Sequence, residues 1–283
     1  MFHKPVSGLA GIVFLLHCAT IVSAQDFRAY TQIFDARVVP AAAQKTAPSR
    51  LVGRSTALFH AGRVFDASGA GNQMTIFEPA HSRFVIIDGA RLVQTELSFE
   101  YIENRLFRAV KNTEKHIVSL QEKDTSEARE LASLLQFQLT PAFKESYDDK
   151  RRLLTLSSPG LSYEIKSDDR ESSEILEAYL NYLDWAARLN YLVNKRALLP
   201  GPRLAVHDVL RRRRMLPVEV TLHSSHLNGL HLRAEHRFNW TLDATAQKMI
   251  ADCEKLMSNG ELKKLSPQEF FEPISTAKAN DRH

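Results

Sequence analysis

Four histidines lie close together near the C-terminal end of the chain, at positions His223, His226, His231 and His236. Imidazole nitrogens bind zinc and related metals, and they gain or lose a proton near neutral pH. We expect two strands here, over 218–223 and 230–240, because apolar and polar residues alternate in both. A three-residue loop ending at Gly229 then makes His223 and His231 diagonal neighbours on the polar face, where both can bind one metal ion.

The turn between these strands has an alternative. A two-residue turn at Asn228-Gly229 would pair Leu222 with Glu235 and so mix the apolar and charged faces. The three-residue loop pairs Leu222 with Ala234, and we prefer it. Because no tight ligand spacing accompanies the histidines, exposed or core-packed imidazoles explain the pattern as well as a metal site does. No cofactor is therefore predicted.

Other catalytic patterns are absent from the sequence. It contains no Gly-x-Ser-x-Gly, Walker A, His-Glu-x-x-His or paired Cys-x-x-Cys motif. The arginine run 211–214 fits either an anionic-lipid site or solvated cations at a helix C-terminus, and we favour the second reading. Cys253 lies on an apolar helical stripe and is interpreted as a core residue. We expect a protein that is not an enzyme, with a metal-dependent hydrolase as the enzymatic alternative.

The first 24 residues resemble a cleavable secretory signal. Lys4 precedes an apolar run, and the small residues Val22-Ser23-Ala24 suit signal peptidase. The run is shorter than the roughly 20 residues of a membrane-spanning helix, which argues against the alternative of an anchor. We therefore expect an exported protein, periplasmic or extracellular, that does not span the membrane after cleavage.

Composition indicates an ordinary globular protein. The 283 residues are 44% hydrophobic and 25% charged, and the net charge of +4 is too small to indicate nucleic-acid binding. Cys18 lies within the signal, so no disulfide is expected in the mature chain. We predict a signal peptide over 1–24, an N-terminal arm or linker over 25–50, a single α+β domain over 51–272 and a polar tail over 273–283.

A β-meander is predicted from about 54 to 97. A loop at Pro79–Ser82 pairs Glu78 with Arg83 as opposite charges and places Phe77 opposite Phe84 on one face. Ile76 and Val85 then share the other face. Both faces of this hairpin are apolar, whereas a sheet with one wet face alternates. Some other element must pack on each side.

The two helices that are expected next along the chain could do so. They span about 98–112 and 126–139, with Ser98 and Ser126 as their expected N-caps. We also expect helices over 173–198, 202–214 and 243–258, the last capped by Asp243, and a further hairpin over 152–165. A short final helix should begin with a capping box formed by Ser266 and Glu269. The predicted fold class is α+β, with a curved antiparallel β-sheet, half-barrel-like, covered by α-helices.

The meander resembles that of the periplasmic lipoprotein-carrier (LolA-like) superfamily. The resemblance covers residues 56–97, above all Met74-Thr-Ile-Phe-Glu-Pro-Ala-His-Ser-Arg-Phe-Val-Ile-Ile-Asp88, and contains no invariant motif. It implies an envelope protein that binds a lipid, lipoprotein or other apolar small molecule in a groove between sheet and helices. Candidate groove residues are the large apolar side chains of the meander: Phe59, Phe65, Phe77, Phe84 and Ile86. The alternative is a structural envelope protein that binds a protein partner through an exposed apolar patch and keeps these residues as core.

Overall fold

The computed structural model describes residues 26–37, 50–68, 73–123, 125–168, 173–194, 197–225 and 229–272. The expected signal, the proline-bounded stretch Pro40–Pro48 and the expected tail over 273–283 lie outside the described residues. The histidine-hairpin position His226 also lies outside them.

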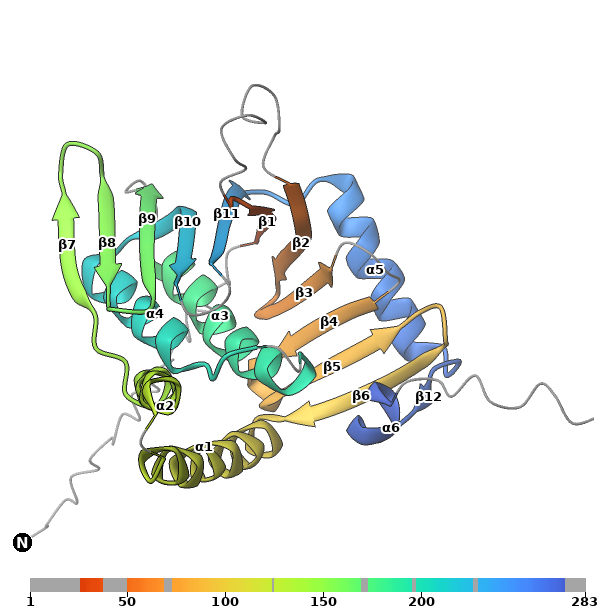
Figure 1. Ribbon diagram of the computed structural model, residues 1–283. Coiled ribbons are helices and arrows are strands. Elements are labelled where there is room, and N and C mark those ends of the chain that lie inside the picture. Colours follow the sequence, from red (N-terminus) through yellow and green to blue (C-terminus); the bar gives the residue numbers. More distant parts are fainter. Residues whose placement is uncertain are drawn as a thin grey trace, which may run out of the picture.

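A single open sheet organises the described chain (Figure 1). Its strands are β1 (Phe27–Asp35), β2 (Arg50–His60), β3 (Arg63–Ser68), β4 (Gln73–Glu78), β5 (Arg83–Asp88), β6 (Val93–Ser98), β7 (Lys144–Asp148), β8 (Leu153–Ser157), β9 (Ser162–Asp168), β10 (Leu216–Ser224), β11 (Leu230–Asn239) and β12 (Lys263–Lys264). The spatial order is β12-β6-β5-β4-β3-β2-β1-β11-β10-β9-β8-β7. Every pairing is antiparallel except that of β12 with β6. The α+β class and the antiparallel sheet are confirmed, and the sheet does not close into a barrel.

The position of β1 differs from the sequence-based interpretation. Residues 25–50 were expected to form an arm or linker, but β1 lies in the middle of the sheet. It pairs with β2 on one side and with β11 on the other. It therefore joins the N-terminal meander to the C-terminal hairpin. The link from β1 to β2 spans residues 36–49, so no short hairpin turn beside β1 marks it as a strand in the sequence.

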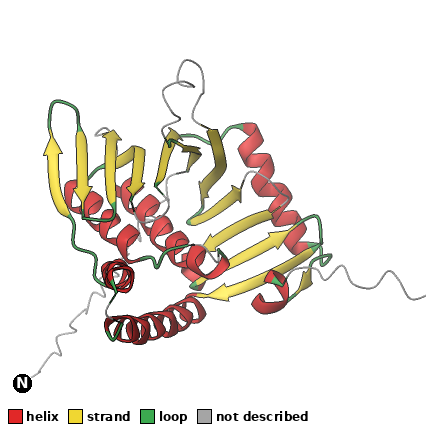
Figure 2. Ribbon diagram, in the orientation of Figure 1, coloured by secondary structure: helices red, strands yellow, loops and turns green. Residues whose placement is uncertain are grey.

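The helices follow their local signals closely (Figure 2). They are α1 (Phe99–Gln121), α2 (Ser126–Leu139), α3 (Ser173–Val193), α4 (Gly201–Arg213), α5 (Ala244–Ser258) and α6 (Pro267–Phe271). Ser98 caps α1 as predicted, but α1 runs nine residues beyond the predicted end at Asn112. Asp243 caps α5, and Ser266 forms the predicted capping box with Glu269. The first turn of α2 is capped by Thr125, one residue before the predicted Ser126.

The two faces of the sheet carry different hydrophobic clusters. The inner face, defined here as the one that bears Phe77 and Phe84, packs with residues of α3 and α4 such as Tyr179 and Leu210. The outer face bears Phe65 and Ile76, which pack with α5. Figure 1 shows α3 and α5 on opposite sides of the sheet. The prediction that both faces of the β4–β5 hairpin are packed is confirmed, although the outer partner is α5 and not one of the two helices that follow the meander.

The β4–β5 hairpin has the predicted register. Phe77 lies opposite Phe84, and Ile76 lies opposite Val85. Arg83 Nε donates to Glu78 Oε2 at 2.7 Å. The link between the strands is the short helix η2 (Pro79–His81), which Ser82 ends with a left-handed backbone at φ 51°.

The β10–β11 hairpin has a register shifted by two residues from the expected one. Leu222 lies opposite Leu232, not Ala234, and His223 lies directly opposite His231. Side chains alternate with a period of two, so a two-residue shift keeps every residue on its predicted face and changes only its partner.

Among the described helices, none has the length and hydropathy needed to cross a bilayer.

Candidate functional site

The predicted groove residues do not all lie on one face. Phe59, Phe77, Phe84 and Ile86 belong to the inner cluster, and each is at most 5% exposed. Phe65 lies on the outer face beneath α5. The inner rings contact one another and rings from the helices: Phe77 lies 5.6 Å from Phe99, measured between ring centroids. The inner face is therefore an aromatic layer at which sheet and helices meet.

A polar cluster is embedded in this aromatic layer. Tyr182 on α3 donates its hydroxyl hydrogen bond to Asp66 Oδ2 on β3. Tyr179, one turn earlier on α3, places its hydroxyl 3.2 Å from His236 Nδ1 on β11. Thr31 Oγ1 on β1 lies 2.9 Å from the same nitrogen. The cluster thus links α3 to three strands of the sheet.

Burial controls the ionisation of these groups. It raises the pKa of the Asp66 carboxyl, and the hydrogen bond from Tyr182 opposes that rise only in part. Burial lowers the pKa of His236 from 6.5 to about 4, so the ring is neutral near pH 7. Burial also raises the pKa of both Tyr179 and Tyr182, which keeps the two hydroxyls protonated. The cluster is a set of uncharged hydroxyl and imidazole groups around one carboxyl.

Three buried oxygens on the inner face have no hydrogen-bond partner among the described residues. They are Asp66 Oδ1, Thr95 Oγ1 and Ser167 Oγ. Asp66 and Thr95 lie in one row across the sheet, because Asp66 pairs with Thr75, which pairs with Ile86, which pairs with Thr95. Buried polar atoms in folded proteins nearly always have a partner. These oxygens are acceptors, or hydroxyl donors, that a bound molecule or an ordered water can satisfy.

The two histidines of the predicted metal site face each other across β10 and β11. The ring centroids of His223 and His231 are 5.8 Å apart. No group of three or more His, Cys, Asp or Glu side chains suited to a metal ion occurs within the described residues. The carboxylates of the hairpin have other partners: Glu219 pairs with Lys166 at 2.8 Å, and Glu235 pairs with Arg233 at 3.0 Å. His236 lies on the inner face, opposite Thr31 of β1.

Ion pairs account for the arginine run. Arg211 reaches both Asp184 and Glu177 on α3, and Arg213 pairs with Glu145 on β7. Asp184 Oδ1 also lies 2.7 Å from His207 Nδ1 at the α3–α4 contact. Burial lowers the pKa of His207, although Asp184 opposes the change. The run lies at the C-terminal end of α4, as the favoured reading expected, but Arg211 and Arg213 form ion pairs with α3 and β7 and are not simply solvated.

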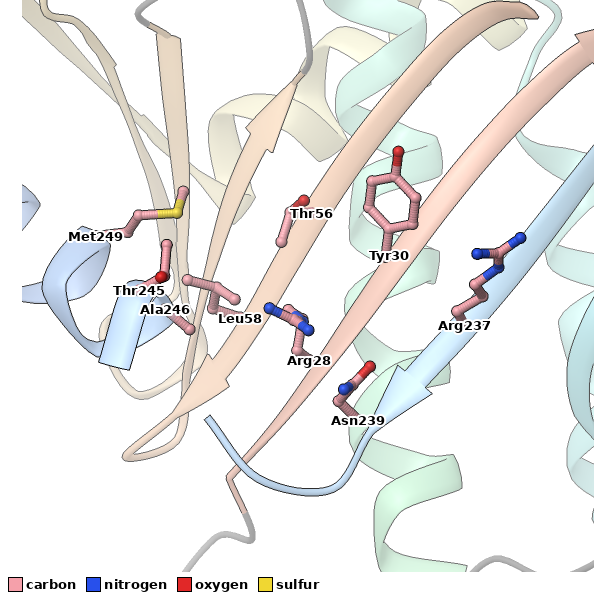
Figure 3. Close-up of a pocket in the computed structure, with 9 residues that line it drawn as sticks. All are labelled: Arg28, Tyr30, Thr56, Leu58, Arg237, Asn239, Thr245, Ala246 and Met249. Carbon is pink, nitrogen blue, oxygen red and sulfur yellow. The ribbon is translucent and has the colours of Figure 1, made fainter. Parts of the chain in front are cut away.

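A hollow of about 490 Å³ lies on the outer face, between β11, β1, β2 and the first turns of α5 (Figure 3). Arg28, Arg237 and Asn239 lie along its strands, with Tyr30 between them, and Met249 faces them from the helix. Its volume falls within the range of small-molecule sites. It lies on the opposite face from the polar cluster.

Neither the polar cluster nor the outer hollow was identified from the sequence. One signal was present: Asp66 follows Val64 at a spacing of two, which places a carboxylate on the same face as apolar residues. Thr31, Arg28 and Tyr30 lie on β1, which was interpreted as an arm. Their neighbours in the fold depend on the pairing of β1 with β11, which sequence periodicity does not reveal.

A search of protein-family models finds none that matches this chain, and a search of curated proteins finds no significant match. The fold and the two sites are therefore interpreted from their own geometry.

Proposed function

We propose that the protein is an exported binding protein that holds an amphiphilic molecule, a lipid or similar apolar compound with a polar group, between the inner face and helices α1–α4. The observation that carries this proposal is the presence of unpartnered buried oxygens within an aromatic layer. The rings suit an apolar chain, and Asp66 Oδ1 and Thr95 Oγ1 suit a polar group attached to it. The signal-like first 24 residues support export.

The resemblance to lipoprotein carriers supports the same location. It implies a half-barrel-like sheet whose inner face binds an apolar ligand under helices. Here Phe99 on α1 stacks on Trp185 of α3 at 3.6 Å, close above Phe77. We propose that the ligand takes the place of these helical rings when α1 and α3 separate from the sheet.

A structural or partner-binding role is the second candidate, and the close packing of the inner rings favours it. Phe27 stacks on Phe59 at 3.9 Å, and Phe59 meets Tyr182 edge-on at 5.8 Å. A core filled in this way needs no ligand to be stable, since burial of each ring stabilises the fold by roughly 1.5–3 kcal/mol. The experiment must therefore separate binding from packing.

The first test is native mass spectrometry of the protein purified gently from its own envelope, followed by titration with the apolar fluorophore N-phenyl-1-naphthylamine. The proposal expects a mass excess that denaturation removes and that extracts as lipid, and it expects fluorescence enhancement by the delipidated protein. A bare mass without enhancement would overturn the proposal and favour the structural role.

Thr95→Val separates the two roles. Valine keeps the shape of threonine and removes a hydroxyl that has no partner, so the variant should be about 1 kcal/mol more stable than the wild type. If a ligand uses that hydroxyl, the same variant should retain less of the co-purified lipid. Thr155→Val on the outer face of β8 is the matched control and should leave retention unchanged. Equal retention by both variants would contradict a role for Thr95 in binding.

A further inference from the structure

The outer-face hollow has a floor of six side chains in two rows across three strands. In the first row Arg28 on β1 lies between Asn239 on β11 and Leu58 on β2. In the second row Tyr30 lies between Arg237 and Thr56. Arg28 and Arg237 are thus diagonal neighbours on adjacent strands. Figure 3 shows both arginines on the floor of the hollow.

The charges around this floor are not balanced. Arg28 Nη1 pairs with Asp243 Oδ2 at 2.8 Å, which fixes the Arg28 side chain in place. Arg28 Nε is buried and has no hydrogen-bond partner among the described residues. Arg237 is exposed, and no ion pair to it occurs within the part of the chain that the structure describes. The nearest carboxylate along β11, Glu235, is paired with Arg233. The positive charge of Arg237 therefore remains available to a ligand in the hollow.

The remaining lining combines the polar residues Thr56, Asn239 and Thr245 with apolar ones. Leu58 forms one end of the floor, and Ala246 and Met249 of α5 form the wall above it. The Tyr30 ring adds an aromatic surface between the two arginines. Asp243 caps α5 at this end, so its carboxylate offsets the positive end of the helix dipole. The hollow therefore combines an anion-recognising side with an apolar side.

We propose that this hollow binds a small organic anion, with a single carboxylate or phosphate head on a short apolar body. The head accepts hydrogen bonds from Arg237, and the body packs against Met249 and the Tyr30 ring, which are partly exposed in the hollow. Charge-assisted hydrogen bonds to a guanidinium give the head its selectivity over a neutral group. The site is separate from the inner face and does not depend on the function proposed above.

Isothermal titration calorimetry of the full chain with sodium octanoate tests the proposal. We expect one octanoate per protein, at least tenfold weaker binding of octanol because it has no charge, and at least tenfold weaker binding of inorganic phosphate because it has no apolar body. Octyl phosphate assigns the head: binding tighter than that of octanoate indicates a phosphate, and weaker binding indicates a carboxylate. Octanol binding as tightly as octanoate, or no octanoate binding, would overturn the proposal.

Arg237→Ala locates the site. Arg237 is exposed, so the variant should fold normally and bind octanoate at least tenfold more weakly. Arg54→Ala is the matched control, because Arg54 is an exposed arginine on the outer face of β2 outside the hollow. It should bind octanoate as the wild type does. If Arg237→Ala and Arg54→Ala weaken binding equally, or neither does, octanoate binds elsewhere and the proposal is wrong.

Discussion

The inner and outer faces of the same strands stabilise the fold in different ways. The inner face joins both halves of the chain, because its aromatic rings and its polar cluster take residues from β1, β3, β11 and α3. The outer face packs mainly against a single helix, α5, and its remaining residues form ion pairs or line a hollow. This difference predicts that substitutions on the inner face lower the stability of the whole fold, whereas substitutions on the outer face have smaller, local effects.

The largest effect is expected for Phe77→Ala on the inner face. Phe77 is 2% exposed and contacts Phe84, Phe99 and Tyr182. Its truncation leaves a cavity between sheet and helices and should lower the free energy of unfolding by about 3–5 kcal/mol. Chemical denaturation followed by circular dichroism measures this. A loss below about 1 kcal/mol would show that the inner layer is loosely packed, and the comparison of the faces would fail.

The second-largest effect is expected for the stability of the fold at acidic pH, through protonation of His236. Burial holds the pKa of the folded-state ring at about 4, below its ordinary value of 6.5. Above pH 6.5 the ring is neutral in both the folded and the unfolded state, and the fold keeps its full stability. As pH falls from 6.5 towards 4, the ring is protonated mainly in the unfolded state, which lowers the free energy of unfolding by up to about 3 kcal/mol. His236→Asn keeps an amide near the position of Nδ1 and cannot be protonated. Unfolding free energies measured from pH 7 to 4.5 should fall less steeply for this variant, and parallel curves would contradict the burial of the ring.

A smaller effect is expected at the outer face for Asp243→Ala. The Asp243 carboxylate accepts from the backbone N–H of Ala246 at 2.8 Å and pairs with Arg28. Loss of a helix cap of this kind lowers the free energy of unfolding by about 1 kcal/mol. Asp243→Asn keeps a capping oxygen and should restore most of the loss, as thermal unfolding can show. Equal losses in the two variants would assign the effect to the ion pair and not to the cap.

The smallest effect is expected for Lys166→Ala, on the part of the outer face away from α5. Lys166 is 53% exposed and pairs with Glu219 at 2.8 Å. Solvent screens such a pair, so the change in the free energy of unfolding should lie within about 1 kcal/mol. A loss as large as that of Phe77→Ala would remove the distinction between the faces. The same denaturation measurement decides the matter.

Local signals predicted the parts of the fold that lie close together in sequence. The β4–β5 hairpin, with Glu78 opposite Arg83, and the caps at Ser98, Asp243 and Ser266 have short-range physical causes. The β10–β11 register was wrong by two residues because the alternation of faces is unchanged by such a shift. The polar cluster was missed because Thr31 and His236 lie 205 residues apart along the chain.

The central position of β1 also determines how late in synthesis the sheet can form completely. Its partner β11 is among the last strands of the chain, so the sheet cannot close its middle until almost the whole sequence has been synthesised. Contacts of such long sequence separation form slowly. Until then the edges of β1 and β10 that pair with β11 present unpaired backbone groups that can pair with other chains. Folding of this protein should therefore be slow and sensitive to concentration, and helper proteins that shield strand edges should raise its yield.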